Sequence, residues 1–440
     1  MIDLAQLRRE PELVTSALGR RGVPAQVLHE LLALDAAHRS LLQEAEALRA
    51  RVKELSRQVA DARKSGDLTL TETLQGESRS VGESERALSQ AVDEAAAQVR
   101  AVLLDIPNIP SDAAPDGAGP EDNVELRQWW PGMDQGQPFP SFADHQRVAH
   151  WDIGTELGIL DMEAGAKLAG SMFPLFRGAG SRLLRALSSL ALDQHSDAYE
   201  EIRPPTFALT ETMTSTGHLP KNSDDMYAIE RDDLWAIPTA EVPLTSMHRG
   251  EILNEALLPI RMTALTACFR REAGAAGRDT RGLLRVHEFD KVELFAYCTP
   301  EQAEAAQADI LARAEALLRA LGLAYRVLDL CAGDLGTSSA RTFDLEVYTP
   351  GVDRWLEVSS VSWFRDYQSR RANVRYRPGG GSPTLVHTVN GSALAWARIW
   401  AALVETYRQA DGSVELPAVL GGYLGGRTTI SRAYAPTSKR

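Results

Sequence analysis

The sequence predicts an α+β fold with a largely antiparallel sheet and flanking helices, preceded by an antiparallel pair of long helices. Three observations lead to this prediction. A heptad pattern occupies most of the stretch from residue 34 to residue 102. Beyond residue 124, helical and alternating segments follow one another without the strand–helix rhythm of a doubly wound sheet. The sequence also has no Walker A motif and no strand followed by Gly-x-Gly-x-x-Gly, so a nucleotide would need another platform.

The predicted helical pair has two apolar seams. The first seam, at spacings of four and three after its first step, comprises Leu34, Leu41, Ala45, Leu48, Val52, Leu55, Val59 and Ala62. The second comprises Leu74, Val81, Leu88, Val92, Ala95, Val99 and Val102, and is weakened by Gly76 and Gly82. Because Lys-Ser-Gly-Asp-Leu-Thr at 64–69 separates them, we expect an antiparallel coiled-coil hairpin about 45 Å long, at roughly 1.5 Å per residue. Taken alone, such a hairpin most often serves to dimerise.

Two prolines mark the end of this hairpin. Pro107 and Pro110 stop the second helix, and the segment as far as Asp122 is rich in Ala, Asp, Gly and Pro. We therefore predict an N-terminal domain at 1–110, a linker at 111–123 and a second domain at 124–440. In that second domain the first clear helix covers Ser181–Ser196, and a strand, Tyr199–Phe207, follows it.

The strongest chemical signal is a predicted strand–loop–strand between Thr266 and Phe295. Its first strand is β-prone, the loop at 273–282 is rich in glycine and expected to be mobile, and the second strand alternates apolar and charged residues. Such a hairpin brings five side chains to a shared surface: Arg270, Glu272, Arg285, Phe289 and Glu293. Arginines bind phosphate bidentately and an aromatic face stacks on a purine, so the set suits a nucleotide beside a small zwitterion. The alternative is a hairpin whose charges are solvated or paired with one another.

Composition limits the class of protein. Hydrophobic residues make up 44% and charged residues 24% of the 440 residues, which is ordinary for a globular protein. The three cysteines show no metal or disulfide spacing and fit a reducing compartment. The N-terminus lacks the apolar run of a signal peptide, and no stretch has the roughly 18 apolar residues of a membrane span. We therefore expect a cytoplasmic protein. Its net charge of −13 argues against general nucleic-acid binding, although a local basic patch remains compatible.

The ordered set of charges from Cys268 to Phe295 resembles motif 2 of the class II aminoacyl-tRNA synthetases, specifically the seryl-tRNA synthetases, and the resemblance extends over essentially the whole chain. Tyr199–Phe207 is similar to motif 1, with Pro205 at a dimer-interface position, and His387–Arg398 is similar to motif 3. The resemblance implies a homodimer with ATP, Mg²⁺, L-serine and tRNA(Ser) as ligands. It also makes charging of tRNA(Sec) plausible.

The resemblance implies roles for individual residues. Arg270 would hold the α-phosphate and the substrate carboxylate, Glu272 would recognise adenine, and Phe289 would stack on it. Arg285 would reach the distal phosphates, and Arg398 the γ-phosphate. The implied ATP site is Arg270, Arg271, Glu272, Arg285, Val286, Phe289, Glu357, Val358, Ser359, Ser360 and Arg398, with Arg270 and Arg398 as the catalytic pair. Glu357 and Ser360 match the family's metal ligands, and their oxygens suit Mg²⁺.

The implied serine site must select by hydrogen bonds to the ammonium and hydroxyl groups, because serine is too small to be selected by bulk. It comprises Thr239, Ala240, Glu241, Glu293 and Ser392. Nothing in the sequence makes His218, in Thr-Gly-His-Leu-Pro-Lys, catalytic. In this family the hairpin grips the long variable arm of tRNA, so a cationic cluster is expected to contact phosphates: Arg49, Arg51, Lys53, Arg57, Arg63 and Lys64.

The chain departs from the family pattern at five positions. Trp363 stands at an expected Asn, and Asn222 at an expected aromatic residue. In motif 3 Ala393 and Ala397 replace glycines, with Trp396 between them. These changes fit ordinary drift or a specialised second copy that resists a seryl-adenylate mimic or serves a biosynthetic pathway. Two rival functions are an amino acid:carrier-protein ligase, which lacks the long arm, and a non-catalytic paralog, which would have lost an ATP arginine or a metal carboxylate.

Overall fold

The computed structural model describes residues 1–273 and 281–432, and the chain forms two compact units. One unit comprises residues 2–106, and the other begins at Pro107 and includes Met1. Residues 274–280, most of the predicted glycine-rich loop, lie outside the described part. Across these two described ranges no helix has both the length and the apolar character that a membrane crossing requires.

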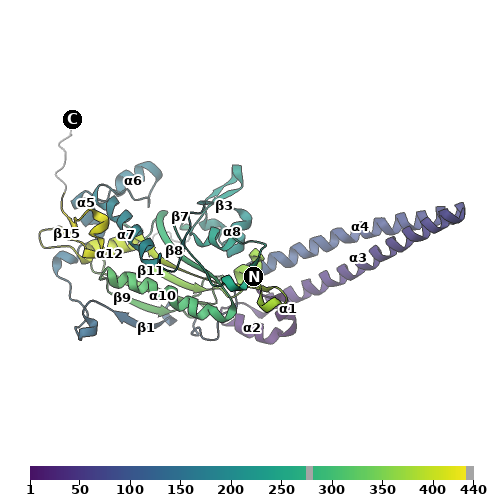
Figure 1. Ribbon diagram of the computed structural model, residues 1–440, viewed down its shortest axis with the longest axis horizontal. Helices are drawn as coiled ribbons and strands as arrows, with labels where there is room; N and C mark the ends of the chain where they lie inside the picture. The colour runs from purple at the N-terminus through teal and green to yellow at the C-terminus, as the bar shows by residue number, and fades with distance from the viewer. Residues whose placement is uncertain (274–280, 433–440) are drawn as a thin grey trace. The chain divides into compact units, whose positions relative to one another are not determined.

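The N-terminal unit is helical. Its elements are α1 (Leu4–Arg9), α2 (Pro11–Gly19), α3 (Ala25–Ser65) and α4 (Leu68–Asp105), of which α3 and α4 lie side by side (Figure 1). The turn between them depends on Gly66, whose φ of +75° is the left-handed conformation that glycine adopts at low cost. The Asp67 side chain then caps α4 by accepting a hydrogen bond from the Leu70 amide at 2.9 Å. The predicted hairpin and its turn are confirmed.

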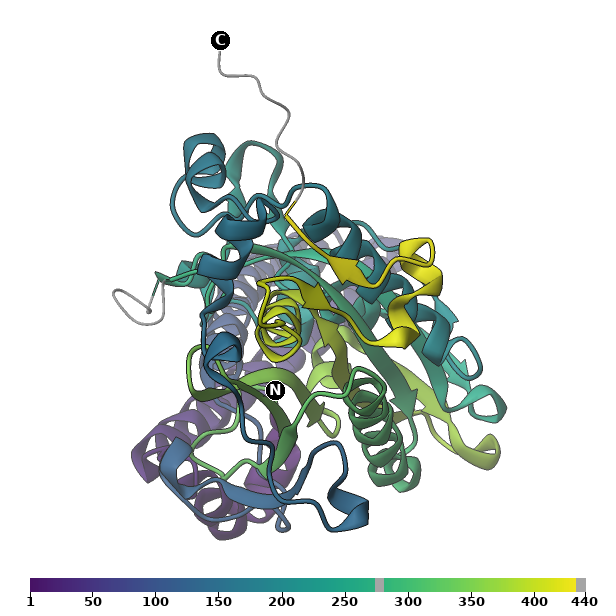
Figure 2. The ribbon, with the colours of Figure 1, turned by 90° about the vertical axis from the view of Figure 1, so that its left-hand side faces the viewer.

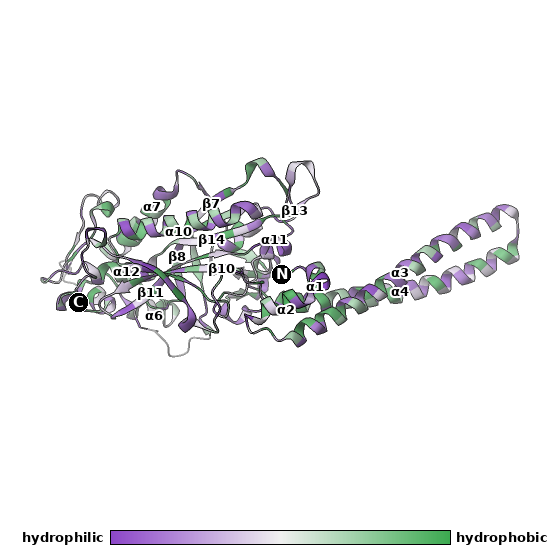
Figure 3. Ribbon diagram, turned by 90° about the horizontal axis from the view of Figure 1, so that it is seen from below, coloured by the Kyte–Doolittle hydropathy of each residue, from purple (hydrophilic) through white to green (hydrophobic). Residues whose placement is uncertain are grey.

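The predicted seam accounts for the packing of α3 on α4. Ala45, Leu55 and Ala62 are buried, and the other seam residues of α3 are partly buried. Hydrophilic and apolar stretches alternate along both helices (Figure 3), as expected for an amphipathic pair. Gly76 and Gly82 interrupt the seam without ending α4, whose residues remain helical through both positions.

The second unit is built on an eight-stranded sheet in the order β1-β9-β10-β11-β14-β8-β7-β2. The strands are β1 (Val124–Trp129), β2 (Glu200–Glu201), β7 (Ile260–Phe269), β8 (Glu288–Cys298), β9 (Tyr325–Asp329), β10 (Arg341–Thr349), β11 (Arg354–Trp363) and β14 (His387–Ala395). All neighbouring pairs are antiparallel except β2 with β7. The predicted class, α+β with a largely antiparallel sheet, is confirmed.

Three long helices cover one face of the sheet: α7 (Ala179–His195), α10 (Ala303–Ala320) and α12 (Trp396–Thr406). They contact one another and the central strands; Figure 2 shows α10 in green and α12 in yellow close to end-on beside the strands. The main hydrophobic core lies between these helices and the sheet. Gly391 faces this core, because a Cβ there would lie 2.5 Å from Ile310. Its neighbours in β14 therefore face the opposite side of the sheet.

Shorter elements complete this unit. The helices are α5 (His150–Leu157), α6 (Met162–Ala169), α8 (Thr210–Thr216), α9 (Glu241–Ser246) and α11 (Tyr367–Ala372). The short strands are β3 (Phe207–Leu209), β4 (Ala228–Ile229), β5 (Leu234–Ala236), β6 (Ile252–Asn254), β12 (Arg375–Arg377), β13 (Thr384–Leu385), β15 (Val414–Glu415) and β16 (Thr429–Ile430). They form three small sheets in the orders β3-β5-β4, β13-β12-β6 and β15-β16.

Two sequence expectations need refinement. The strand expected over Tyr199–Phe207 is interrupted: β2 pairs for two residues, and Pro204 and Pro205, which have no N–H to donate, separate it from β3. The segment expected to be a linker is fixed to the second unit, because the Ser111 amide donates to the Ala340 carbonyl at 2.7 Å. Composition alone did not reveal this anchoring.

Candidate active site

Two adjoining chambers open on the face of the sheet opposite the long helices. The first, here called the nucleotide chamber, is lined by Arg270, Glu272, Leu283, Leu284, Arg285, Val286, Phe289, Lys291, Glu357, Val358, Ser359, Ser392, Ala395, Ala397 and Arg398. The second, called the polar chamber, is lined by Gly217, His218, Asn222, Thr239, Glu241, Arg270, Lys291, Glu293, Gly336, Thr337, Ser338, Ser339, Glu357, Ser360, Ser362, Phe364, Asn390 and Ser392. Both lists contain Arg270, Lys291, Glu357 and Ser392, so these four side chains form the boundary between the chambers.

Arg270 stands where strand β7 ends. Its amide donates to the His287 carbonyl at 2.9 Å, which holds the β7–β8 hairpin together beyond its last regular pair. The guanidinium carbon lies 5.2 Å from the centre of the Phe289 ring, within cation–π distance. The predicted approach of Arg270 and Phe289 is thus present, and the arginine is placed between an aromatic surface and the polar chamber.

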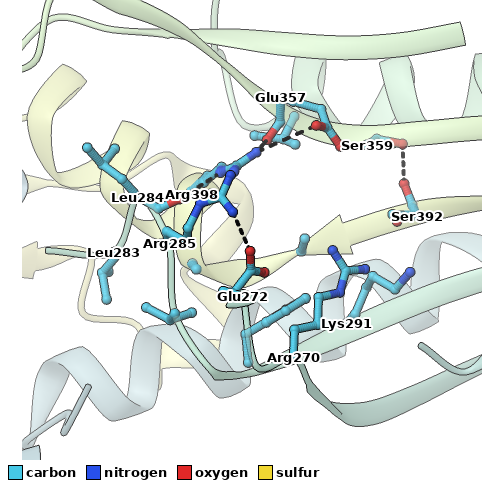
Figure 4. A pocket seen from close by; sticks show the side chains of 15 residues that line it. Arg270, Glu272, Leu283, Leu284, Arg285, Lys291, Glu357, Ser359, Ser392 and Arg398 are labelled. Atoms are coloured by element: carbon cyan, nitrogen blue, oxygen red, sulfur yellow. Dashed lines mark hydrogen bonds and ion pairs between the residues drawn. The ribbon is translucent and has the colours of Figure 1, made fainter. Parts of the chain in front are cut away.

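Glu272 and Arg285 occupy opposite sides of the same hairpin and form an ion pair with each other (Figure 4). Glu272 has φ +52°, a conformation uncommon for a residue with a side chain, and this turn directs the carboxylate back into the nucleotide chamber. The Arg285 side chain is one-third exposed. Because solvent screens such a pair, its cost of opening is small, and both groups remain available to a ligand.

Arg398, in the first turn of α12, is aimed by backbone carbonyls. Its Nε donates to the Leu284 carbonyl at 3.1 Å and its Nη1 to the Glu357 carbonyl at 2.6 Å (Figure 4). The Glu357 carboxylate is 3.8 Å away. Ser359 ties the neighbouring strands β11 and β14 together by donating to the Ser392 carbonyl at 2.6 Å. Arg398 is therefore oriented by two backbone carbonyls and one carboxylate of the protein.

The polar chamber contains a buried carboxylate pair. Glu293, 1% exposed, forms an ion pair with Lys291 and accepts a hydrogen bond from the Thr239 hydroxyl at 2.9 Å. Glu241 accepts from the Gln368 amide at 2.5 Å. Burial and then the charge of Glu293 raise the pKa of Glu241 to about 7. The pair therefore combines one carboxylate in an ion pair with Lys291 and one that titrates near neutrality.

His218 also lines this chamber, where its Nδ1 lies 2.7 Å from the Thr216 hydroxyl. Burial, followed by the charges of Arg270 and Lys291, lowers the pKa of His218 to about 3. The imidazole is therefore neutral at physiological pH. It can shape the chamber and exchange a hydrogen bond, but it adds no positive charge.

A hard cation fits the border of the two chambers. Glu357 and Ser360 both line the polar chamber, and a register shift in the β10–β11 pairing allows these residues, three apart, to share a face. Asp344 lies directly opposite Ser360, and its Oδ1 is buried with no hydrogen-bond partner in the described ranges. Burial and then the charge of Glu357 raise the pKa of Asp344. Among residues 1–273 and 281–432 no three His, Cys, Asp or Glu side chains cluster closely enough to hold a metal. The carboxylate and hydroxyl oxygens of Glu357 and Ser360 are hard ligands, which suit an ion such as Mg²⁺ that keeps water and substrate oxygens as further ligands.

The predicted site residues fall into two groups. The chambers bring together all the predicted ATP and serine residues except two. Arg271 is exposed and lines neither chamber, and Ala240 is buried in a separate core cluster. Sequence reasoning missed Lys291 and Asn390. The period-2 alternation of β8 contained a signal for Lys291, since it stands two residues before Glu293 and must share its face.

The family departures lie at different depths. Ala397 lines the nucleotide chamber and Asn222 the polar chamber. The other three are in the core: Trp363 is 9% exposed and donates to His387 Nδ1 at 3.3 Å, and Trp396 packs edge-on against Phe176 at 5.0 Å. Ala393 belongs to the same core cluster.

Half of the cationic cluster predicted on the arm forms ion pairs with the arm's own carboxylates. Arg49 pairs with Glu85 at 2.6 Å, Arg51 pairs with Glu77, and Arg57 pairs with Glu54 at 2.7 Å. Lys53, Arg63 and Lys64 are exposed. Exposed ion pairs are weak because solvent screens them, so phosphates can replace these carboxylates at little cost.

An antiparallel sheet that presents two motif arginines to a divided, charged cavity is the arrangement of a class II aminoacyl-tRNA synthetase. The family model described as tRNA synthetase class II core domain (G, H, P, S and T) matches residues 227–407, so the second unit belongs to that class. The model described as Seryl-tRNA synthetase N-terminal domain matches residues 1–110.

Full-length relatives are more specific. The chain is 47% identical to a serine–tRNA ligase of Gemmatimonas aurantiaca, covering 97% of this chain and 99% of that protein. It is 46% identical to a serine–tRNA ligase of Acidithiobacillus ferrooxidans, with 98% and 100% covered. A seryl-tRNA synthetase from Pyrococcus horikoshii, solved in complex with ATP, superposes with a TM-score of 0.88 at 33% identity, covering 98% and 100% of the two chains. The chain belongs to the seryl-tRNA synthetase family, whose members are serine–tRNA ligases.

Proposed function

We propose that this enzyme activates L-serine with ATP in the two adjoining chambers and then transfers serine to the 3′ end of tRNA(Ser). The observation that carries the proposal is the shared wall. Arg270 and Lys291 border both chambers, so a nucleotide in one and a small zwitterion in the other would meet at these two cations. The ATP complex of the Pyrococcus horikoshii relative supports ATP as the nucleotide.

The first step joins two anions. A serine carboxylate oxygen attacks the α-phosphorus of ATP, a new phosphorus–oxygen bond forms, and the bond to the bridging oxygen breaks to release pyrophosphate. Catalysis therefore consists of positioning and charge neutralisation. Arg270 would neutralise charge at the reacting phosphate, and Arg398, held by two carbonyls, would do so toward the leaving pyrophosphate. No side chain has to become a nucleophile.

The remaining nucleotide contacts follow from the same chamber. Phe289 offers its ring as a stacking surface, and Glu272 is directed at the chamber where an adenine amino group would donate to it. Arg285 would exchange Glu272 for a distal phosphate, and Val286 and Val358 contribute walls of the same chamber. We assign Glu357 and Ser360 as the protein ligands of Mg²⁺, which when bound would neutralise phosphate charge.

Serine selection rests on buried acceptors. Glu241, Glu293 and Thr239 are all buried in the polar chamber, where they would receive the substrate ammonium and hydroxyl groups together with Ser392. An amino acid that lacks the hydroxyl leaves its partners unpaired in a dry site, which disfavours alanine strongly.

For the second substrate we propose that the helical arm contacts tRNA phosphates through Arg49, Arg51, Lys53, Arg57, Arg63 and Lys64. The arm's match to the Seryl-tRNA synthetase N-terminal domain supports this use over a simple dimerisation coiled coil. We also propose a homodimer that uses the motif 1 region around Pro205, and charging of tRNA(Sec) alongside tRNA(Ser).

Two assays on one preparation test the function. Serine-dependent ATP–pyrophosphate exchange reports on the first step, and charging of bulk tRNA with radiolabelled serine reports on both steps. We expect both to be positive, with alanine inactive in exchange. Exchange without charging of tRNA would favour the carrier-protein ligase. A negative result in both assays would favour the non-catalytic alternative.

One observation favours a specialised second copy as an alternative. The Ala397 methyl group lines the nucleotide chamber at a position where the family pattern has glycine. If this methyl group narrows the chamber, Ala397→Gly should become more sensitive to a seryl-adenylate analogue than the unaltered enzyme. Equal inhibition of the two proteins would refute the resistance version.

A further inference from the structure

A completely buried polar network lies behind the nucleotide chamber. His150 on α5 and Glu405 on α12 are both 0% exposed. The Glu405 Oε1 atom accepts from the His150 amide at 2.9 Å and lies 2.8 Å from the His150 Nδ1 atom. Its Oε2 atom accepts from the Gly351 amide, in the β10–β11 turn, at 2.8 Å. One carboxylate thus joins α5, α12 and a turn of the central sheet.

The second imidazole nitrogen points at the motif 2 hairpin. His150 Nε2 accepts a hydrogen bond from the Leu283 amide at 2.9 Å. A backbone amide can only donate, so Nε2 must carry no proton, and the ring proton must be on Nδ1 and directed at Glu405. Glu405 therefore fixes both the tautomer and the orientation of the ring.

The chain approaches this histidine closely. Gly282, immediately before Leu283, has φ +61°, and a Cβ there would lie 2.5 Å from His150 Nε2. A side chain at this position would push the hairpin away from the imidazole. Gly282 and His150 together therefore determine where the backbone at Leu283 lies.

The network continues into the active site. Leu283 and the next residue, Leu284, line the nucleotide chamber, and the Leu284 carbonyl accepts from Arg398 Nε at 3.1 Å. Arg285 follows directly. A displacement of the Leu283 amide would therefore move the carbonyl that orients Arg398 and the backbone that carries Arg285.

We infer that His150 and Glu405 are positioning residues for ATP, acting through the Leu283–Leu284 backbone on Arg398. This inference rests on the proposed function of the chamber. An apolar pair could fill the same volume without the desolvation cost of a buried carboxylate. A fully paired polar network instead specifies one geometry, which is what a phosphate-binding arginine requires.

Two substitutions at one position separate the two hydrogen bonds. In His150→Asn the amide nitrogen takes the place of Nδ1, so the contact with Glu405 is kept and the acceptor for Leu283 is lost. In His150→Gln the amide oxygen reaches toward the place of Nε2, so the acceptor for Leu283 is kept. We expect His150→Asn to raise KM for ATP about 10-fold, which corresponds to about 1.4 kcal/mol, with KM for serine within about 2-fold. His150→Gln should restore much of the ATP affinity.

The measurements are KM for ATP and for serine in pyrophosphate exchange, direct ATP binding by calorimetry, and thermal unfolding. His195→Asn is the matched control, since His195 is equally buried, on α7, and its ring nitrogens have no hydrogen-bond partner among the described residues. If His150→Asn does not fold, Glu405→Gln, which disturbs the carboxylate with little change in volume, should show the same selective rise in KM for ATP.

The outcomes are distinguishable. The inference is supported if KM for ATP rises in His150→Asn, stays unchanged in His195→Asn and is largely restored in His150→Gln. Equal changes in both KM values, or a loss of thermal stability alone, would overturn it while leaving the proposed function standing. Failure of the unaltered protein to bind ATP or catalyse exchange would overturn the proposed function and this inference with it.

Discussion

Replacing Glu293 by Gln tests the central feature of the polar chamber. The substitution keeps the size of the side chain and an oxygen that can accept from the Thr239 hydroxyl, but it removes the negative charge. Lys291, whose side chain is 8% exposed, then loses its buried partner. The ammonium group of serine would lose the same carboxylate.

The magnitude follows from burial. Removing one partner of a buried ion pair typically costs about 3–5 kcal/mol, divided here between the free energy of unfolding and ligand binding. A hydrogen bond to a charged group contributes about 1.5–3 kcal/mol. We therefore expect KM for serine to rise roughly 10- to 150-fold, while KM for ATP changes far less.

The assay is pyrophosphate exchange at saturating ATP with serine varied, together with thermal unfolding. Glu241→Gln is the matched control. Because the pKa of Glu241 is about 7, this carboxylate is already substantially protonated at neutral pH, and neutralising it should have the smaller effect. The reasoning would be refuted if both variants raised KM for serine equally, or if Glu293→Gln acted on ATP and serine alike.

Three further predictions follow from the same structure. As pH rises from 6 to 8 the ionisation of Glu241 should lower KM for serine, and Glu241→Gln should flatten that profile. Because burial raises the pKa of Glu241 from 4.5 to about 7, the folded chain binds more protons than the unfolded chain between these two values. The contribution of Glu241 to the free energy of unfolding without serine should therefore decrease as pH rises from 4.5 to about 7, as calorimetry with and without the substitution will show. Glu357→Gln should raise the Mg²⁺ concentration for half-maximal exchange several-fold and should weaken the binding of Mn²⁺, measured by electron paramagnetic resonance. Unchanged Mn²⁺ binding would show that Glu357 is not a metal ligand. Leu55→Ala, at a fully buried seam position, should destabilise the arm by about 2–5 kcal/mol in denaturant unfolding. It should reduce charging of tRNA but leave pyrophosphate exchange unchanged. The control Leu13→Ala, at a residue 61% exposed, should change neither the stability nor the charging.

The alternation and heptad patterns account for most of the predicted architecture. Both patterns are local, because a period of two or of seven residues assigns each side chain to a face whatever the partner element is. The seam through Leu55 and the hairpin from Ile260 to Cys298 were therefore predictable. The end of β2 at Glu201, ahead of the two prolines, was not, since it depends on which strand lies alongside and for how long.

By itself the sequence determined the α+β class, the helical arm and the order of the three motifs, because these depend on residue type and spacing along the chain. The tertiary structure alone decided how charges from distant segments combine. Lys291 and Glu241 come together only because α9 packs beside β8, and the pKa of Glu241 rises only because that packing excludes water. The contact of His150 with Leu283 has the same origin: a hydrogen bond between segments far apart in sequence leaves no periodic signal, and only the folded chain brings the two groups within reach.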